Sequence, residues 1–209
     1  MKKVELFIGN NLFTDGKRVF KNSNIFFDSD IVPDIERVSV IVLYAKGFDL
    51  ENCKKIVDLY SFIQVNDIVF VVGNENEKLL LKNELSNLFS QWIKIGVNPN
   101  TSSEDFYSSL KMGLRGVSRR TDFVILQFGT MAELKRETIL QLMHSAIRLK
   151  KDITIPMWEN KRGHPIIFSR KLLPILFSLR KEKGLPFLLK HYEGLIEKVP
   201  VNDKNILKK

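Results

Sequence analysis

The feature that most constrains the fold of this chain is a regular alternation of short apolar segments with longer amphipathic segments. The short segments are rich in β-branched and aromatic residues, which predicts strands at 37–44, 67–73, 92–98, 122–128 and 152–158. The segments between them place apolar residues at helical spacing, which predicts helices at 50–63, 76–89, 102–117 and 135–150. This order indicates an α/β protein.

Strands that alternate with helices are joined by right-handed crossovers, so we expect a mostly parallel sheet. The segment 122–128 is apolar throughout, which is typical of a strand covered on both faces, and we assign its last residue, Phe128, to the core. The predicted fold class is therefore a Rossmann-like three-layer α/β sandwich. In such sheets the ligand binds beyond the carboxyl ends of the strands, so we expect the site within residues 44–49, 73–76, 98–103 and 129–133.

Residues 1–36 do not follow this alternation. Two apolar segments at 3–10 and 18–27 flank the dipeptide Asp15-Gly16, which is typical of a hairpin turn. We therefore expect a β-hairpin-like addition or an added edge piece. No stretch of the chain has the composition of a linker, so we expect one domain over 1–209, with the addition at 1–36 and the core at 37–209.

The composition bounds the class of protein. The chain has 209 residues, 44% of them apolar, which is enough for one full hydrophobic core. No apolar run approaches the roughly 18 residues of a membrane span, so we expect no membrane partner. The N-terminal residues lack the long apolar stretch and cleavage site of a signal peptide, so we expect a cytoplasmic protein. The single cysteine, Cys53, fits a reducing compartment, and its helical surroundings favour a structural thiol over a nucleophile.

The net charge of +9 comes entirely from the second half of the chain. Residues 1–100 hold 12 Lys and Arg against 13 Asp and Glu, whereas residues 101–209 hold 21 against 11. A basic half suits a small phosphate-bearing ligand or a nucleic acid, and a solvated lysine-rich surface is an equal alternative. We do not favour nucleic acid, because no basic stretch interleaves exposed aromatic residues. The cysteine and histidines lack the spacing of metal ligands, so we expect no zinc site.

The stretch "WENKRGHPIIFSRKLL" places Gly163, His164 and Pro165 between a basic dipeptide and an apolar run. Composition alone explains it as a turn, because glycine permits any φ, proline fixes φ, and the residue before a proline is held extended. Its place among the other motifs of the chain supports a second interpretation.

Five segments occur in a fixed order along the second two thirds of the chain. They are "DIVFVVG", "VNPN" with "SSLKMGL", "VILQFGTMAELKRETILQLM", "KRGHPIIFSRKLLPIL" and "EKGLPFLLKHYEGLIEKVPVNDKNIL". Over residues 66–207 this set resembles the molybdenum cofactor cytidylyltransferases, and more broadly the nucleotidyltransferases that join a nucleotide to molybdopterin. The resemblance implies the nucleotidyltransferase fold, transfer of a nucleotide from CTP or GTP to molybdopterin, and Mg²⁺ as the cofactor of an active enzyme.

The resemblance also implies the residues of the site. Those on the nucleotide side are Gly47, Gly73, Asn98, Ser108, Ser109, Gly129 and Thr130, and those on the acceptor side are Arg162, Gly163, His164 and Pro165. Each has a plain structural alternative, such as a helix start for the serines and a solvated turn for the basic residue. The expected partner is a small anionic ligand of nucleotide or molybdopterin type.

The chain departs from the family pattern at the positions that bind the metal ion and the phosphates. Thr130 stands where the family has a metal-binding aspartate, and the chain ends in Lys208 and Lys209 where acids are expected. Only 19 residues separate Gly47 from Asp67, which is too few for the family's glycine-rich loop and the helix after it. The loss of two carboxylates removes most of the charge stabilisation that phosphoryl-type transfer depends on. We therefore assign no catalytic residue and no metal ligand.

Two segments, 40–47 and 5–21, compete as the counterpart of the family's first strand and glycine loop, and neither has the family's spacing. Three functions follow. The first is a working nucleotidyltransferase, the second is a degenerate relative that binds a nucleotide, a cofactor or a partner without turnover, and the third is a nucleic-acid binder. Because the departures concern one reaction step, we prefer the second.

Overall fold

The computed structural model describes residues 37–44, 47–63, 65–85, 92–99, 106–181 and 183–208, together with four two-residue strands near the N-terminus. The chain divides into two compact units, Met1–Asp34 and Ile35–Lys209. In the first unit, β1 (Lys3–Val4) pairs antiparallel with β4 (Phe27–Asp28), and β2 (Phe13–Thr14) pairs antiparallel with β3 (Lys17–Arg18). The last pair flanks Asp15-Gly16, which agrees with the predicted hairpin-like addition.

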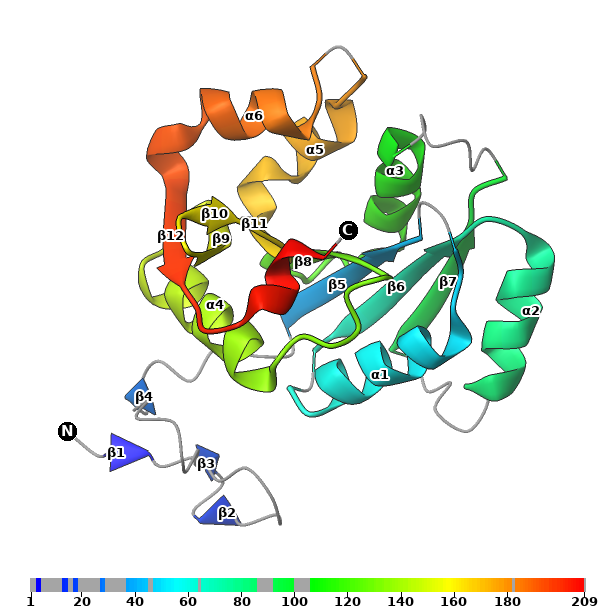
Figure 1. Cartoon of the computed structure of the whole chain (residues 1–209), viewed down its shortest axis with the longest axis horizontal. Coiled ribbons are helices and arrows are strands. Elements are labelled where there is room, and N and C mark those ends of the chain that lie inside the picture. Colours follow the sequence, from blue (N-terminus) through cyan, green and yellow to red (C-terminus); the bar gives the residue numbers. More distant parts are fainter. Residues whose placement is uncertain are drawn as a thin grey trace. The chain divides into compact units, whose positions relative to one another are not determined.

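The second unit is built on one mixed sheet (Figure 1). Four parallel strands lie in the order β7-β6-β5-β8, with the bounds β5 Val38–Leu43, β6 Asp67–Val72, β7 Ile93–Val97 and β8 Phe123–Phe128. Beyond β8 the sheet continues with β11 (Ile166–Ser169), which runs antiparallel to both β8 and β9 (Ile153–Trp158). β12 (Ile196–Pro200) pairs parallel with β9, and β10 (Lys161–Arg162) pairs antiparallel with it. The prediction of a mostly parallel sheet is confirmed.

The helices between the strands lie where the periodicity predicts them. Their bounds are α1 Leu50–Ser61, α2 Glu75–Glu84, α3 Phe106–Gly116 and α4 Arg136–Arg148. Two further helices follow β11, namely α5 Leu173–Ser178 and α6 Leu185–His191, with single 3₁₀ turns at Arg170–Leu172, Glu193–Leu195 and Lys204–Leu207. None of the described helices has both the length and the apolar composition needed to span a bilayer.

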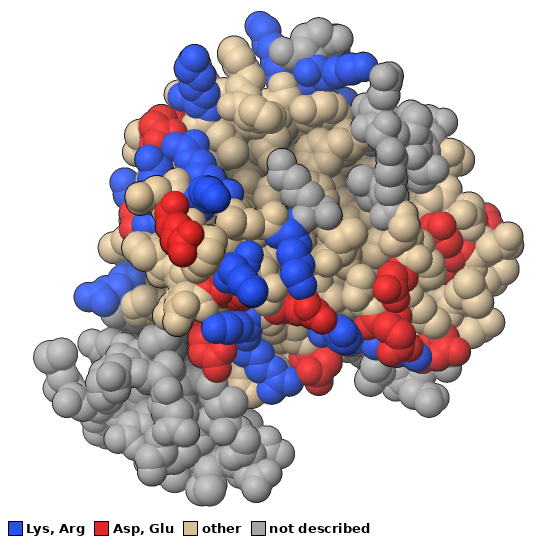
Figure 2. Space-filling view, in the orientation of Figure 1, with Lys and Arg blue, Asp and Glu red and all other residues tan. Residues whose placement is uncertain are grey.

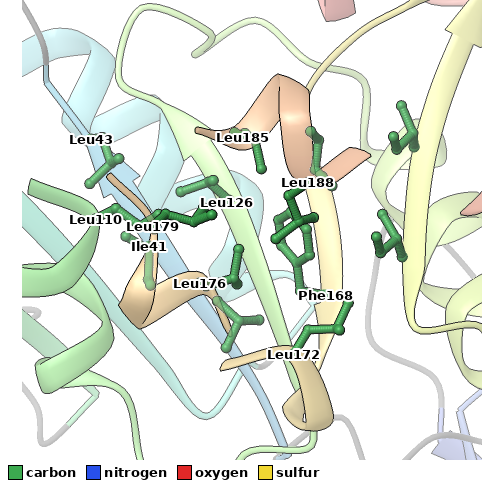
Figure 3. Packing of buried hydrophobic residues seen from close by; sticks show 14 of the residues in the cluster. Ile41, Leu43, Leu110, Leu126, Phe168, Leu172, Leu176, Leu179, Leu185 and Leu188 are labelled. Atoms are coloured by element: carbon green, nitrogen blue, oxygen red, sulfur yellow. The ribbon is translucent and has the colours of Figure 1, made fainter. Parts of the chain in front are cut away.

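Both faces of the sheet are covered. α3, α5 and α6 lie on one side, and α1 and α4 lie on the other (Figure 1). Figure 3 shows the first side, where Ile41, Leu126 and Phe168 of the sheet meet leucines from α3, α5 and α6. Along β5, Val40 and Val42 are as fully buried as Ile41, although they point to the opposite face. This double burial confirms the predicted three-layer sandwich.

Candidate functional site

The parallel strands β5, β6, β7 and β8 end at one edge of the sheet, here called the carboxyl edge. The predicted site residues that directly follow these strands are Gly73, Asn98 and Gly129, and Gly47 lies four residues after the end of β5. β11 begins at Ile166, opposite Leu126 of β8, so residues 163–165 come to the same edge. The structure therefore brings the predicted nucleotide-side and acceptor-side residues to one edge, as the rule for open α/β sheets requires.

Asn98 is the centre of a buried polar cluster at this edge. It is only 3% exposed, its side-chain amide donates to Ser109 Oγ at 2.9 Å, and its amide oxygen accepts from Ser108 Oγ at 3.2 Å. Both serines lie in the first turn of α3, so the cluster joins the end of β7 to this helix. An amide and two hydroxyls offer both donors and acceptors, which is the set of groups that reads a base or a ribose.

Gly129 lies against an aromatic ring that the sequence analysis did not foresee. A methyl group at position 129 would overlap the ring of Tyr44, which follows β5. Tyr44 is buried, and its hydroxyl lies 3.1 Å from Cys53 Sγ. Close approach of this ring is therefore what requires glycine at position 129, and the ring fills the space between the ends of β5 and β8.

Burial fixes the protonation of the two groups in this contact. It raises the pKa of the Tyr44 hydroxyl above its ordinary value and raises the pKa of the Cys53 thiol to about 12. A thiol protonated at neutral pH is a poor nucleophile, so Cys53 is a packing residue, as the sequence indicates.

The first strand-to-helix turn is closed by an acid of the protein itself. The carboxylate of Asp49 caps α1 by accepting from the backbone N–H groups of Glu51 at 2.8 Å and Asn52 at 3.3 Å. Gly47 precedes this cap with φ +67°, a conformation that favours glycine. N–H groups at such a helix start are the usual donors to a bound phosphate, and here a negative charge already occupies them.

The second turn, after β6, is closed in the same way. Asn74 caps α2 by accepting from the N–H of Glu77 at 2.9 Å, and the Glu77 carboxylate accepts from the N–H of Gly73 at 2.7 Å. The arrangement differs from a capping box by one residue, because the Glu77 carboxylate accepts from Gly73 and not from the cap residue Asn74. The backbone donor of Gly73 is thus engaged within the protein, which favours the structural alternative for this residue.

Thr130 is exposed at the end of β8, and the acid nearest to it in sequence is Glu133. The Glu133 carboxylate binds Lys208 at 2.7 Å and Lys55 at 3.5 Å, and these cations, Lys208 first, hold its pKa below the ordinary value. Among the described residues, no three acid, histidine or cysteine side chains gather as metal ligands. A threonine beside an acid neutralised by two lysines does not fit a divalent cation, which prefers several carboxylate oxygens.

Asp203 is a buried acid in the C-terminal segment that the sequence analysis did not single out. It is 1% exposed and accepts from Lys135 N–H at 2.8 Å, Thr138 Oγ1 at 3.0 Å and Asn205 N–H at 3.0 Å. It thereby joins the last 3₁₀ turn to the start of α4. Its oxygens are committed to these three donors, so its role in the described structure is to position the chain.

His164 packs beside β8 at the carboxyl edge. The imidazole ring of His164 lies edge-on to the ring of Phe128, with centroids 4.6 Å apart. The backbone N–H of His164 donates to the carbonyl of Ile206 at 2.8 Å. The N–H of Gly163 donates to the carbonyl of Pro156 at 3.0 Å, and the His164–Pro165 bond is cis. The turn interpretation of this segment therefore describes its backbone, while its position leaves the histidine ring at the ligand edge.

Two neighbours of His164 differ from the sequence-based expectation. Phe128 is half-buried at the margin of the core, because it covers the histidine ring and does not point fully inward. Arg162 is not a free cation, since its guanidinium donates to both oxygens of Glu193, at 2.6 and 2.7 Å. Lys198 and then Arg162 hold the pKa of the Glu193 carboxyl below its ordinary value.

Solved structures share this fold at low sequence identity. Rv0371c from Mycobacterium tuberculosis H37Rv superposes with a TM-score of 0.62 and 15% identity, over 80% of this chain and 89% of that chain. A structure of Rv0371C in complex with manganese gives 0.59 and 16%, over 79% and 88%. A 4-diphosphocytidyl-2C-methyl-D-erythritol synthase from Anaerococcus prevotii DSM 20548 gives 0.60 and 12%, over 83% and 91%. At these identities the likeness establishes the fold alone.

At the level of sequence, no curated protein matches this chain. The MobA-like NTP transferase domain does match, over residues 54–196. The match begins within α1 and so leaves out β5 and the turn that Asp49 closes. Because it covers about two thirds of the chain and the fold agrees, the chain belongs to the MobA-like NTP transferase domain family.

Proposed function

We propose that this protein binds a small anionic ligand of nucleotide or molybdopterin type at the carboxyl edge and does not transfer the nucleotide. The observation that carries the proposal is the Asp49 cap on α1. A transferase of this kind needs the first turn of the sheet to donate to a triphosphate. A carboxylate already seated on those donors repels the triphosphate and leaves it without partners.

The nucleoside end of the ligand belongs at the Asn98 cluster. Asn98, Ser108 and Ser109 form a rigid set of donors and acceptors, and a set whose side chains bond one another is preorganised for a ligand. Gly47, Gly73, Gly129 and Thr130 follow the neighbouring strands and complete the nucleotide side in this proposal. Of these, Gly129 contributes close packing with Tyr44, and Thr130 contributes an exposed hydroxyl.

The acceptor end belongs at the segment 162–165. The His164 ring, supported by Phe128, offers an aromatic face to a pterin, while Gly163 and Pro165 hold the backbone in place. Arg162 is paired with Glu193, so an acidic ligand would have to replace Glu193 in order to bind Arg162. Since Thr130 and Glu133 do not suit a divalent cation, we expect binding to be independent of Mg²⁺.

The rival function is active transfer from CTP or GTP to molybdopterin with Mg²⁺, a step of molybdenum cofactor biosynthesis. Family membership and the Asn98 cluster speak for it, whereas Thr130 and the Asp49 cap speak against it. In either case we regard the chain as one functional domain with an N-terminal addition at residues 1–36. We also place the protein in the cytoplasm, where a single buried thiol such as Cys53 stays reduced.

Isothermal titration calorimetry with CTP, GTP and molybdopterin, each in Mg²⁺ and in chelator, tests the proposal. We expect binding of at least one of these ligands with the same affinity in both conditions. His164→Ala should weaken molybdopterin binding by about tenfold, whereas the matched control His191→Ala on α6 should not. Binding that disappears in chelator, or a site that takes none of the three ligands, would overturn the proposal.

A further inference from the structure

A basic groove runs between α3 and α5 and reaches Ser108 at the carboxyl edge. One part is a pocket of about 430 Å³ whose lining includes Lys111, Arg115, Arg180 and Lys181. The other is a pocket of about 330 Å³ whose lining includes Arg119 and Arg170. The two parts meet where the guanidinium of Arg115 lies 5.5 Å from the ring centroid of Phe177. We call these two pockets together the α3–α5 groove.

Lys111, Arg115, Arg119 and Arg180 give the groove positive charge that no described acid in its lining neutralises. No acidic residue is among the described residues that line either pocket. Across the described ranges, no ion pair joins Lys111, Arg115, Arg119 or Arg180 to an acid. Other cations of the described chain do form such pairs, as Arg136 does with Asp58 and Lys208 with Glu133. An uncompensated row of cations produces a field that attracts anions.

The surface view shows where basic and acidic side chains gather on one face of the molecule (Figure 2). In Figure 2, Lys and Arg side chains gather at the upper end of the molecule, over the region of α5 and α6, whereas acidic and basic side chains are intermixed over α1 and α2. Basic side chains also occur on the left and in the centre of Figure 2, where acidic side chains lie among them.

Exposed aromatic rings lie within the same segment. Phe177 on α5 is 39% exposed and Phe187 on α6 is 50% exposed, and Lys183 Nζ lies 6.0 Å from the centroid of the Phe187 ring. From the sequence we did not favour nucleic acid, because we expected no exposed aromatic residues in a basic stretch. The exposed rings of Phe177 and Phe187 show that this expectation is wrong for residues 170–191. Rings open to solvent beside cations are what single-stranded nucleic acids stack on.

We propose that the α3–α5 groove binds single-stranded nucleic acid without sequence preference. Two cationic pockets on either side of one aromatic ring suit successive phosphates with a base stacked between them, because the backbone repeats its charge and every base has a π-face. A single phosphorylated metabolite would fill only one pocket. The groove goes beyond the ligand site proposed above, since none of its cations belongs to that site and only Ser108 is common to both.

Fluorescence anisotropy of the full chain with a labelled 20-nucleotide uridine oligomer tests the groove across about 50 to 200 mM salt. The double variant Arg115→Gln/Arg180→Gln should weaken binding about tenfold and reduce the salt slope by about 1.4, because each lost phosphate contact in a single strand accounts for about 0.7. The matched control Arg148→Gln/Lys150→Gln removes two exposed cations at the end of α4 and should change neither quantity.

Two further variants separate stacking from charge. Phe177→Leu should weaken binding about fivefold with the salt slope unchanged, because it removes a stacking face and no cation. Arg115→Lys/Arg180→Lys should keep the salt slope, and circular dichroism of each variant reports its folding. The proposal is overturned if the oligomer fails to bind at low salt, if the control pair loses as much affinity as the groove pair, or if duplex DNA of equal length competes as well as the single strand.

Discussion

The two halves of the carboxyl edge differ in the groups that occupy them. On the side of β5 and β6, the protein's own groups occupy the positions that a triphosphate would need, with Tyr44 packed on Gly129, Asp49 on the start of α1 and Glu77 on Gly73. On the side of β7 and β11, the Asn98 cluster and the ring of His164 keep polar and aromatic groups at the edge.

This difference teaches that recognition and charge handling are separable in one fold. The groups to which we assign recognition of a nucleoside or an acceptor lie on or next to elements that the core holds in place, namely α3 for the serines and β8 for the ring that packs on His164. The groups that handle phosphate charge depend on a loop and on carboxylates that tolerate substitution, since a loop position carries little of the packing energy.

The largest expected effect comes from disturbing the contact between Tyr44 and Gly129. Gly129→Ala drives a methyl group into the Tyr44 ring and should lower the free energy of unfolding by about 3 kcal/mol, because a packed core resists added volume. Urea unfolding measures it, with Gly194→Ala as the control, since nothing lies within 4 Å of a methyl group there. Equal stability of the two variants would mean that the ring does not fill this space.

A second prediction concerns the acid that fastens the C-terminal turn to the edge. Asp203→Ala leaves three donors without their acceptor and should cost about 2 kcal/mol of unfolding free energy. Asn202→Ala, the exposed neighbour, should change the stability by less than about 0.5 kcal/mol. Thermal unfolding measures the stability of both variants. An Asp203→Ala variant as stable as the original protein would show that Asp203 does not hold the C-terminal turn in place.

Restoring one carboxylate sharpens the comparison at β8. Thr130→Asp should raise the affinity for Mg²⁺ in the presence of nucleotide by about threefold, because one carboxylate anchors Mg²⁺ only with help from substrate phosphates. It should not produce turnover, since the Asp49 cap remains. Titration of Mg²⁺ into both proteins measures this, and identical affinities would show that residue 130 does not face the ligand.

The smallest effect is the pH dependence of the exposed Glu133 pair. Lys208 lowers the pKa of this carboxyl in the folded protein below its ordinary value of 4.5, so its contribution is present above that value and is lost as the pH falls through the lowered pKa. Glu133→Gln should therefore slightly lower the melting temperature at pH 7, and the difference should shrink as the pH falls below 4.5. A difference that persists at acid pH would show that the glutamate acts through packing.

Much of the architecture was predictable from the chain. Strands with continuous apolar runs and helices with clear periodicity were found within a few residues, because burial on both faces leaves a strong pattern. The elements after residue 158 were not assigned, since β11 has four residues and α5 has six, too short for any period to stand out.

The sequence predicted which residues lie at the carboxyl edge but not the contacts that they make there. The order of motifs brought Asn98, the serines and His164 to one edge, whereas the Tyr44 ring on Gly129 depends on two neighbouring strands that are distant in sequence. The structural role of Asp203 was not predicted, because two of its three donors, on Lys135 and Thr138, are distant in sequence. The exposure of Phe177 and Phe187 escaped notice because periodicity does not reveal which face of a short helix is covered.

The central claim is that this chain has kept ligand recognition and has lost nucleotidyl transfer. Pyrophosphate release from CTP, GTP, ATP and UTP, each with molybdopterin and with Mg²⁺ or Mn²⁺, tests it most directly. We predict no release above the protein-free blank in any combination, because Asp49 and Thr130 leave the triphosphate without donors and without a metal site. Release that depends on the protein and on the metal, with any one of the four nucleotides, would contradict the claim.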